Sequence, residues 1–390
     1  MQMHDLSIEI KGLDADDAWY RMFPKIDLGL SSNIPIGGKN SNGSSFSVTL
    51  TSGGYDPISA SLAHDAQLDM TILAKYAKLQ SASDLLENVV TFYIREAAYA
   101  ELLDCYDRLI KEARELYAFS AKMYPDAPTV PLEVQLANHR VKQIELEREK
   151  LVKTHTTQLA RLKRMIDVPA EQRIELAAID VERDVFQGFN PNTTTFEEVR
   201  RNSLQEKMAR ISAKLAEHNI LVAWAKYIPK FSFNVRTPDP VNNSSDDDSY
   251  YFTIGMSVPL WHWGELGRGR DRARKQKQKT LLKNKAEVLA WEDQWFYLRS
   301  RFQEQVGTEK LAWAEVELRQ LQVRKNEILF NTGGVSFVNL TQVEMAKIRK
   351  EILAVQIREA KLLAKLKLFF ESGKLLNRFI QVEDFENEEE

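Results

Sequence analysis

The residues AWYRMFPKIDLGL at positions 18–30 recur as AWAKYIPKFSFNV at positions 223–235. Alanine, tryptophan, proline and lysine keep their places in both copies, and most other positions keep their chemical type. The segments that follow also correspond, since FSVTL at 46–50 matches FTIGM at 252–256. A repeat over this distance predicts that the chain consists of two similar halves, each forming one structural unit.

Each half contains two segments in which apolar and polar residues alternate, which is typical of strands with one apolar face. The apolar positions are Ile26, Leu28 and Leu30; Phe46, Val48 and Leu50; Phe231, Phe233 and Val235; and Tyr250, Phe252, Ile254, Met256, Val258 and Leu260. The connections 37–45 and 237–249 are rich in loop-forming glycine, asparagine, serine and aspartate. The sequence therefore predicts strand pairs at about 24–52 and 229–262.

A long helical segment follows each strand pair, ends at a breaker and is followed by a return helix. Apolar or small residues at steps of four and three mark the first long helix at Ile72, Tyr76, Leu79, Ser83, Leu86, Val90, Tyr93, Ala97 and Ala100. The second return helix has the same spacing at Met345, Ile348, Ile352, Val355, Glu359, Leu362, Leu366 and Phe369. This seven-residue repeat predicts left-handed coiled-coil packing.

These segments define a domain organisation and a fold class that is α+β but mainly α. The predicted divisions are a first repeat at 14–195, with a helical hairpin at about 57–166 and an irregular equatorial segment at about 167–195; a second repeat at 196–375, with a hairpin at about 264–372; and an acidic tail at 376–390.

Composition excludes several classes of function. With 53 basic and 56 acidic residues the net charge is −3, so no global field favours nucleic acid. The single cysteine, Cys105, excludes an internal disulfide and lies in a helical pattern as a packing residue. No histidine pair has helical metal-ligand spacing and no catalytic constellation is present, so we expect neither an enzyme, nor a bound metal, nor a cofactor.

Basic residues are concentrated between Arg268 and Lys285, just after the last predicted strand. We interpret these basic residues as the solvated face of a helix below a membrane. The alternative is that they contact anionic lipid headgroups. The glycine-rich segment 264–269 lacks the dinucleotide-binding fingerprint and is interpreted as a flexible turn.

Aromatic residues lie at both ends of the predicted strands. The predicted girdle consists of Trp19, Trp224, Tyr250, Tyr251, Trp261 and Trp263. A membrane-spanning strand needs about 9–11 residues, with aromatic side chains at both interfaces. The pattern indicates strands in an outer membrane, with Phe252, Ile254 and Met256 facing lipid; the alternative is an aromatic cluster that caps a soluble sheet.

In order, spacing and duplication, residues 14–375 resemble the TolC-like outer membrane efflux protein family, also called outer membrane factors. Pro24 and Pro229 each precede a strand, and the run from Phe252 to Trp261 is similar to the family's fourth strand. The run 330–340 is similar to the tip of the family's helical hairpin.

The resemblance implies a homotrimer in which each chain gives four strands to one shared β-barrel in the outer membrane. The long helices would form an α-helical barrel across the periplasm, with 167–195 and 373–390 as a girdle around it. The implied function is the exit duct of a tripartite efflux or type I secretion system, docked on a periplasmic adaptor (membrane fusion) protein and an inner-membrane pump. The rival class is a soluble, non-enzymatic coiled-coil scaffold with a small β cap.

The sequence departs from the family pattern in two places. Only about 23 residues precede Pro24, so we expect the helix before the first strand to be shortened or lost, and Met1–Lys11 has no secretion signal. At the hairpin tip, Gly333 and Gly334 are expected to form the turn, and Ser336 to cap the return helix. Asn339 and Gln342 would line a pore constriction as neutral amides, whereas a family member with a closed tip has acidic residues there.

Overall fold

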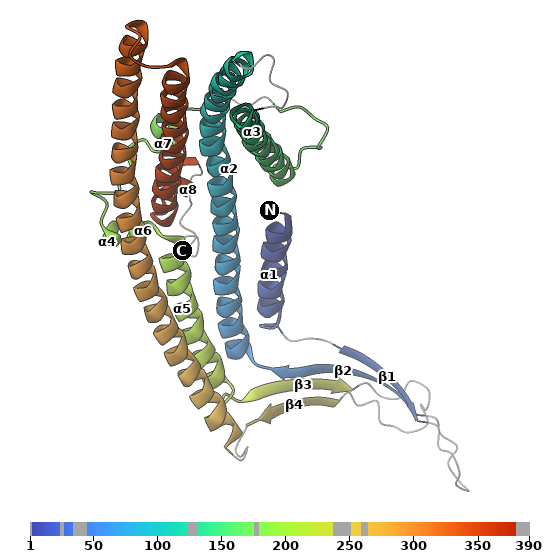
Figure 1. Ribbon diagram of the computed structural model, residues 1–390. Coiled ribbons are helices and arrows are strands. Elements are labelled where there is room, and N and C mark those ends of the chain that lie inside the picture. The colour runs from blue at the N-terminus through green and yellow to red at the C-terminus, as the bar shows by residue number, and fades with distance from the viewer. Residues whose placement is uncertain are drawn as a thin grey trace. The chain divides into compact units, whose positions relative to one another are not determined.

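The computed structural model describes residues 2–23, 27–33, 45–123, 131–174, 179–236, 251–258 and 264–379. In these ranges the chain is mainly helical and has one four-stranded sheet, which confirms the mainly-α, α+β class (Figure 1). The elements are α1 (Gln2–Tyr20), β1 (Asp27–Asn33), β2 (Ser45–Tyr55), α2 (Pro57–Lys122), α3 (Leu132–Met165), the π-helical turn η1 (Val181–Val185), α4 (Phe196–Asn202), α5 (Leu204–Ala225), β3 (Lys230–Arg236), β4 (Tyr251–Ser257), α6 (Glu265–Asn331), α7 (Phe337–Glu371) and α8 (Lys374–Phe379).

The chain divides into two compact units. Unit 1 contains the described residues up to Ser81 together with Leu204–Leu289, and therefore α1, the sheet, α5 and the first parts of α2 and α6. Unit 2 contains Ala82–Ser203 and the described residues from Ala290 onward, and therefore the rest of α2 and α6 with α3, η1, α4, α7 and α8.

The sheet in unit 1 is antiparallel throughout, in the order β1-β2-β3-β4. Its register brings the apolar positions of all four strands into one row, since Leu28 lies opposite Leu50, Leu50 opposite Val235, and Val235 opposite Phe252. Side chains two residues apart share a face, so the alternation predicted for each strand is in phase across the sheet. β1 and β4 are the edge strands.

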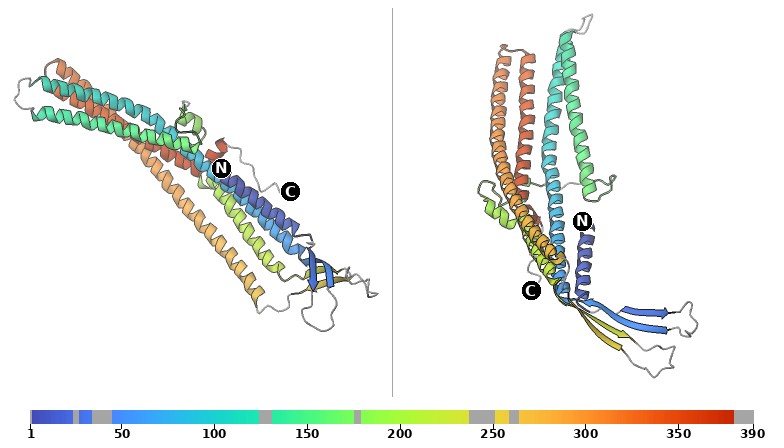
Figure 2. Two further views of the ribbon diagram at one scale, coloured as in Figure 1. Left: turned by 90° about the vertical axis from the view of Figure 1, so that its right-hand side faces the viewer. Right: turned by 90° about the horizontal axis from the view of Figure 1, so that it is seen from below.

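The helices of unit 1 follow the same order as the strands that they adjoin (Figure 2). The polar contacts that join neighbours are Lys78 to Asp5 at 2.5 Å (α2 to α1), His218 and Lys214 to the fully buried Asp69 at 2.8 and 3.2 Å (α5 to α2), and Asn284 to the carbonyl of Ala209 at 2.9 Å (α6 to α5). Helices α1 and α6 are thus the two outer helices of this unit.

Unit 2 has two principal apolar clusters. The first surrounds Trp295 and Phe369 and joins η1, α4 and α8 to the long helices. The second, around Leu109, Ile144 and Ile352, joins α2, α3 and α7. The segment predicted to be irregular at 167–195 thus supplies packed residues, among them Phe186 and Phe189, whose rings contact that of Phe369.

The predicted apolar seam of the second return helix is confirmed, because Met345, Ile348, Ile352 and Val355 are all buried. The predicted seam of α2 is wrong in its second half. Ala97 and Ala100 are exposed, and the buried line runs through Val90, Ile94, Ala98 and Leu102 in steps of four. Such steps exceed the 3.5-residue period that a left-handed supercoil requires, so the seam of α2 does not follow one heptad register.

Two boundary expectations also change. Of the two alternatives for the helix before the first strand, shortened or lost, the second is wrong, because α1 is present with 19 residues. At the other end, α8 covers Lys374–Phe379 and buries Leu375 and Leu376, so residues 376–379 belong to packed unit 2 and not to an acidic tail.

Candidate functional site

Strands β3 and β4 expose their described side chains to an unusual degree. No described side chain of β3 or β4 is buried, and Phe252, Ile254 and Met256 are each more than 60 % exposed. Cross-strand pairing sets Phe233 opposite Ile254 and Phe231 opposite Met256. An antiparallel sheet in water normally buries one face against another layer, whereas Phe252, Ile254 and Met256 of β4 are left uncovered.

The opposite face of the same strands carries small and polar residues. Thr253 and Ser257 lie there with Gly255, which is paired with Ser232. A Cβ atom at Gly255 would lie 2.5 Å from the Ser232 hydroxyl oxygen. Glycine at this position therefore leaves room for the Ser232 side chain on the neighbouring strand.

The predicted aromatic girdle is described only in part. Trp19 and Trp224 are about half exposed near the ends of α1 and α5 that lead into the strands. Trp19 contacts His64, and the guanidinium of Arg270 lies 5.0 Å from the ring of Trp224. Tyr250, Trp261 and Trp263 and the side chain of Tyr251 fall outside the described residues, and so does Pro24. The girdle stays a prediction.

The tip between α6 and α7 is a tight, fully hydrogen-bonded turn. The N–H of Gly334 donates to the Leu329 carbonyl at 2.7 Å, and the N–H of Gly333 donates to the Phe330 carbonyl at 3.0 Å. This pair of bonds closes the end of a helix when the residue after the cap adopts positive φ, and Gly333 has φ +78°. Positive φ, expected at the glycine pair, is therefore found at Gly333.

The return helix begins as the sequence predicted. The Ser336 hydroxyl oxygen accepts from the backbone N–H of Asn339 at 3.4 Å, which caps α7. Phe337 then packs on Phe119 of α2 and on Phe330 of α6, with ring centroids 4.7 and 6.3 Å apart. The side chains of Asn339 and Gln342 are both exposed. Their role in a constriction stays a prediction.

A cluster of carboxyl groups surrounds Glu344 of α7 beyond this turn, and no sequence pattern predicted it. The pKa of Glu344 is raised to about 7, chiefly because burial disfavours the charged form and also because of a hydrogen bond with Glu112. Repulsion from Glu112, Glu327 and Glu115 acts in the same direction. Three helices, α2, α6 and α7, therefore bring acidic groups together here.

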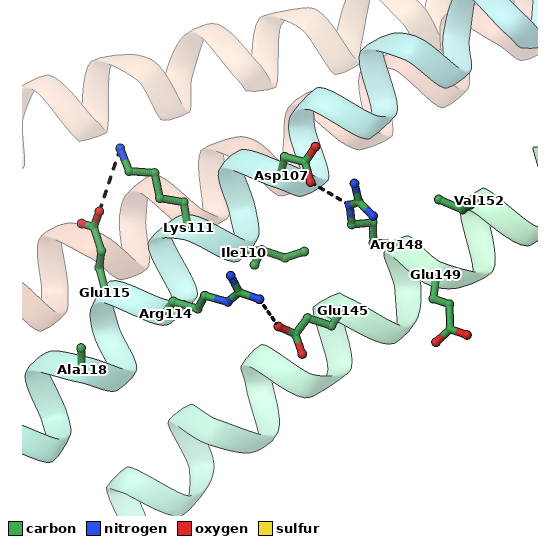
Figure 3. Close-up of a pocket in the computed structure, with 10 residues that line it drawn as sticks. All are labelled: Asp107, Ile110, Lys111, Arg114, Glu115, Ala118, Glu145, Arg148, Glu149 and Val152. Carbon is green, nitrogen blue, oxygen red and sulfur yellow. Dashed lines mark hydrogen bonds and ion pairs between the residues drawn. The ribbon is translucent and has the colours of Figure 1, made fainter.

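A groove of about 670 Å³ lies between α2 and α3 (Figure 3). Two ion pairs cross it, Arg114 to Glu145 at 2.6 Å and Arg148 to Asp107 at 2.7 Å. Ile110 and Val152 supply apolar floor and wall. The hairpin of α2 and α3 was predicted, but the groove was missed, because no local pattern specifies which side chains of the two helices face each other.

Side chains that could bind a metal ion are not gathered in the described part of the chain. Within it, no group of three histidine, cysteine, aspartate or glutamate side chains is placed to hold a metal ion. Cys105 is buried as predicted, and burial raises the pKa of its thiol. None of the described helices combines the length and the apolar character needed to cross a membrane.

No protein-family model matches the sequence, and neither does any functionally curated protein. Solved structures do match. The outer membrane channel MtrE of Neisseria gonorrhoeae in its open state shares 15% identity with a TM-score of 0.79, over 95% of this chain and 85% of that chain. The outer membrane protein VceC of Vibrio cholerae shares 13% identity with a TM-score of 0.75, over 95% and 92%. The outer membrane channel CmeC of Campylobacter jejuni shares 12% identity with a TM-score of 0.77, over 99% and 84%.

The chain therefore has the fold of these outer membrane proteins over nearly its whole length. The resemblance inferred from the repeated strand–helix pattern is confirmed at the level of the fold.

Proposed function

We propose that this chain is one subunit of a homotrimeric outer-membrane exit duct, which passes substrates from an inner-membrane pump across the periplasm and the outer membrane. The observation that carries the proposal is the uncovered apolar row of β4 (Phe252, Ile254 and Met256), in a strand pair, β3 and β4, that buries no described side chain. A bilayer covers such a row without a second protein layer. A soluble scaffold with a β cap would instead bury it.

The size of the sheet supports several copies per duct. Four strands leave β1 and β4 as open edges, and backbone groups at an edge cannot remain unpaired in hydrocarbon. About eight strands are needed to close a barrel around side chains alone. Three copies give twelve strands and a barrel without edges.

The long helices support a tube made of several chains. On α6, large apolar side chains remain exposed at Leu282, Leu289, Phe296, Leu311, Leu318, Leu321 and Ile328. Several are seven residues apart, the spacing of a coiled-coil seam. Neighbouring chains in a helical barrel would cover them.

The groove between α2 and α3 is the part of unit 2 that we assign to the periplasmic adaptor. Its charged rim (Asp107, Lys111, Arg114, Glu145, Arg148) can pair with polar side chains of a helical hairpin, and Ile110 and Val152 give that hairpin an apolar contact (Figure 3). Recognition of a helix in a groove uses this combination. The proposal includes neither catalysis nor nucleic acid.

Paired arginine substitutions in β4 test the proposal. A cation on the lipid face near the midplane costs about 2–4 kcal/mol, so Ile254→Arg should remove the protein from the outer-membrane fraction. Thr253→Arg, one residue away on the opposite face, should be tolerated. Equal tolerance, or a folded monomer in the aqueous fraction by light scattering, would favour the soluble scaffold.

A further inference from the structure

The outer face of α1 carries an apolar stripe that nothing described in the chain covers. Its members, spaced by three and four residues, are Met3, Leu6, Ile10 and Leu13, with Tyr20 continuing the line. Each is more than half exposed. The inner face buries Ala15 and Ala18, and α1 contacts α2 through the Lys78–Asp5 ion pair and the rings of Trp19 and His64. A helix with apolar side chains on two opposite faces is built to lie between two neighbours, and unit 1 supplies only one.

The same helix is acidic. Glu9, Asp16 and Asp17 are exposed, and the structure gives them no ion pair within its described ranges, whereas Asp14 is paired with Lys11. Asp17 lies in the apolar stripe itself, four residues after Leu13. Asp16 and Glu9 are seven residues apart, and so they share one flank of the stripe.

Helix α6 shows the complementary pattern on the face turned away from α5. Lys277 and Asn284, seven residues apart, mark the face that contacts α5. The opposite face, at steps of four and three, reads Arg268, Arg272, Lys275, Lys279, Leu282, Ala286 and Leu289. Its first four residues are exposed cations, and no ion pair is found for them in the described part of the chain. Four of the nine basic residues in the run seen in the sequence thus lie in one row on an exposed face of α6.

Sheet order determines which helices meet when copies associate. β1 and β4 are opposite edges, so closing a barrel sets β4 of one copy beside β1 of the next. Helix α1 leads into β1 and α6 follows β4, with similarly short connections at 21–26 and 258–264. Helix α6 of one copy therefore meets α1 of the next, antiparallel and at the same level.

We propose that the basic row of α6 docks on the acidic, apolar outer face of α1 in a second copy of this chain, and that this contact sets the register of neighbouring subunits. Matching the two stripes from the strand ends pairs position 17 with 268, 13 with 272, 10 with 275, 6 with 279, and 3 with 282. Asp16 and Asp17 then face Arg268 and Arg272. The lysine stems cover Ile10 and Leu6, while Glu9 lies near Lys275. The inference rests on the proposed trimer and adds its interface.

Charge reversal tests the contact. The double variant Arg268→Glu/Arg272→Glu should speed subunit exchange between differently labelled trimers in detergent by about tenfold or more, since a buried charge pair acts on dissociation. Adding Asp16→Arg/Asp17→Arg should restore slow exchange. The matched control Arg274→Glu/Lys285→Glu carries the same charge change outside this row and should leave exchange unchanged.

Disulfide trapping tests the register in a Cys105→Ser background. Leu13→Cys with Arg272→Cys should give oxidised trimer ladders, while Leu13→Cys with Arg274→Cys should not. If light scattering shows a trimer but neither the cross-link nor the rescue is seen, the proposed α1–α6 interface is wrong. The proposed duct is not contradicted by that result. A monomer under the same conditions overturns the proposed function itself.

Discussion

At the scale of single residues, two glycines occupy positions where the backbone itself requires glycine. Gly333 closes α6 at φ +78° with open space around its missing side chain. Gly373, between α7 and α8, has φ +69°, and a Cβ there would lie 2.6 Å from the Asn202 carbonyl oxygen. Both glycines have positive φ, but only at Gly373 would an added Cβ atom meet a neighbouring backbone atom.

Alanine at these glycines should separate the two effects. Gly333→Ala carries only the cost of positive φ, about 1–2 kcal/mol, and should lower the thermal midpoint slightly. Gly373→Ala adds a backbone clash with the end of α4, so its loss should be clearly larger. Circular dichroism melts of both variants in detergent measure the difference. Equal losses would mean that α4 moves away freely.

Glu344 makes stability depend on pH in a known direction. Its folded pKa of about 7 lies above the usual glutamate value, because burial and the Glu112 carboxyl disfavour its charge. The folded state therefore holds a proton that the unfolded state has lost, and stability falls as pH rises from about 4.5 through 7. Glu344→Gln should stabilise the protein at pH 8 by about 1–2 kcal/mol, after allowance for solvent screening.

The same variant should have little effect at pH 5, where Glu344 is already protonated. Thermal melts at the two pH values check this, and Glu317→Gln on α6 serves as a control for an exposed carboxyl. A stabilisation that is the same at both pH values would contradict the coupling to Glu112.

At the scale of elements, boundaries followed from the sequence and seams only in part. α2 begins at Pro57 and α6 at Glu265, within one residue of the hairpin starts predicted at about 57 and 264. The seam of α2 was misplaced because Ala97, Ala98 and Ala100 are equally small, so pattern alone could not select among them. The Glu344 cluster escaped prediction because it joins residues far apart in the chain, and the α2–α3 groove because no local pattern sets the register between the two helices.

The corrected seam can be tested with adjacent alanines. Ala98 is buried beside Leu102 and Cys105, whereas Ala97 is exposed on the same turn. Ala98→Glu would bury a charge and should cost about 2 kcal/mol or more, while Ala97→Glu should be nearly neutral. Chemical denaturation followed by circular dichroism compares them. The reverse ranking would restore the original heptad.

At the scale of the whole molecule, three copies of the chain in the proposed duct would place three copies of each lumen-facing side chain in a ring. Three-fold symmetry would turn Asn339 into a ring of three amides at the tip. Asn339 is the third residue after the Ser336 cap, at a helix N-terminus that tolerates negative charge well. Asn339→Asp should therefore fold normally while adding three carboxylates to the ring.

Planar-bilayer conductance then tests whether this ring is the constriction. Three carboxylates in a narrow, poorly screened opening attract cations strongly, so Asn339→Asp should raise cation selectivity and create a block by divalent or trivalent cations. Asn339→Ser, which adds no charge, should keep the original selectivity. If Asn339→Asp leaves both conductance and selectivity unchanged in a trimer of normal stability, the narrowest point of the passage lies away from Asn339, and Gln342 one turn further along α7 becomes the next position to test.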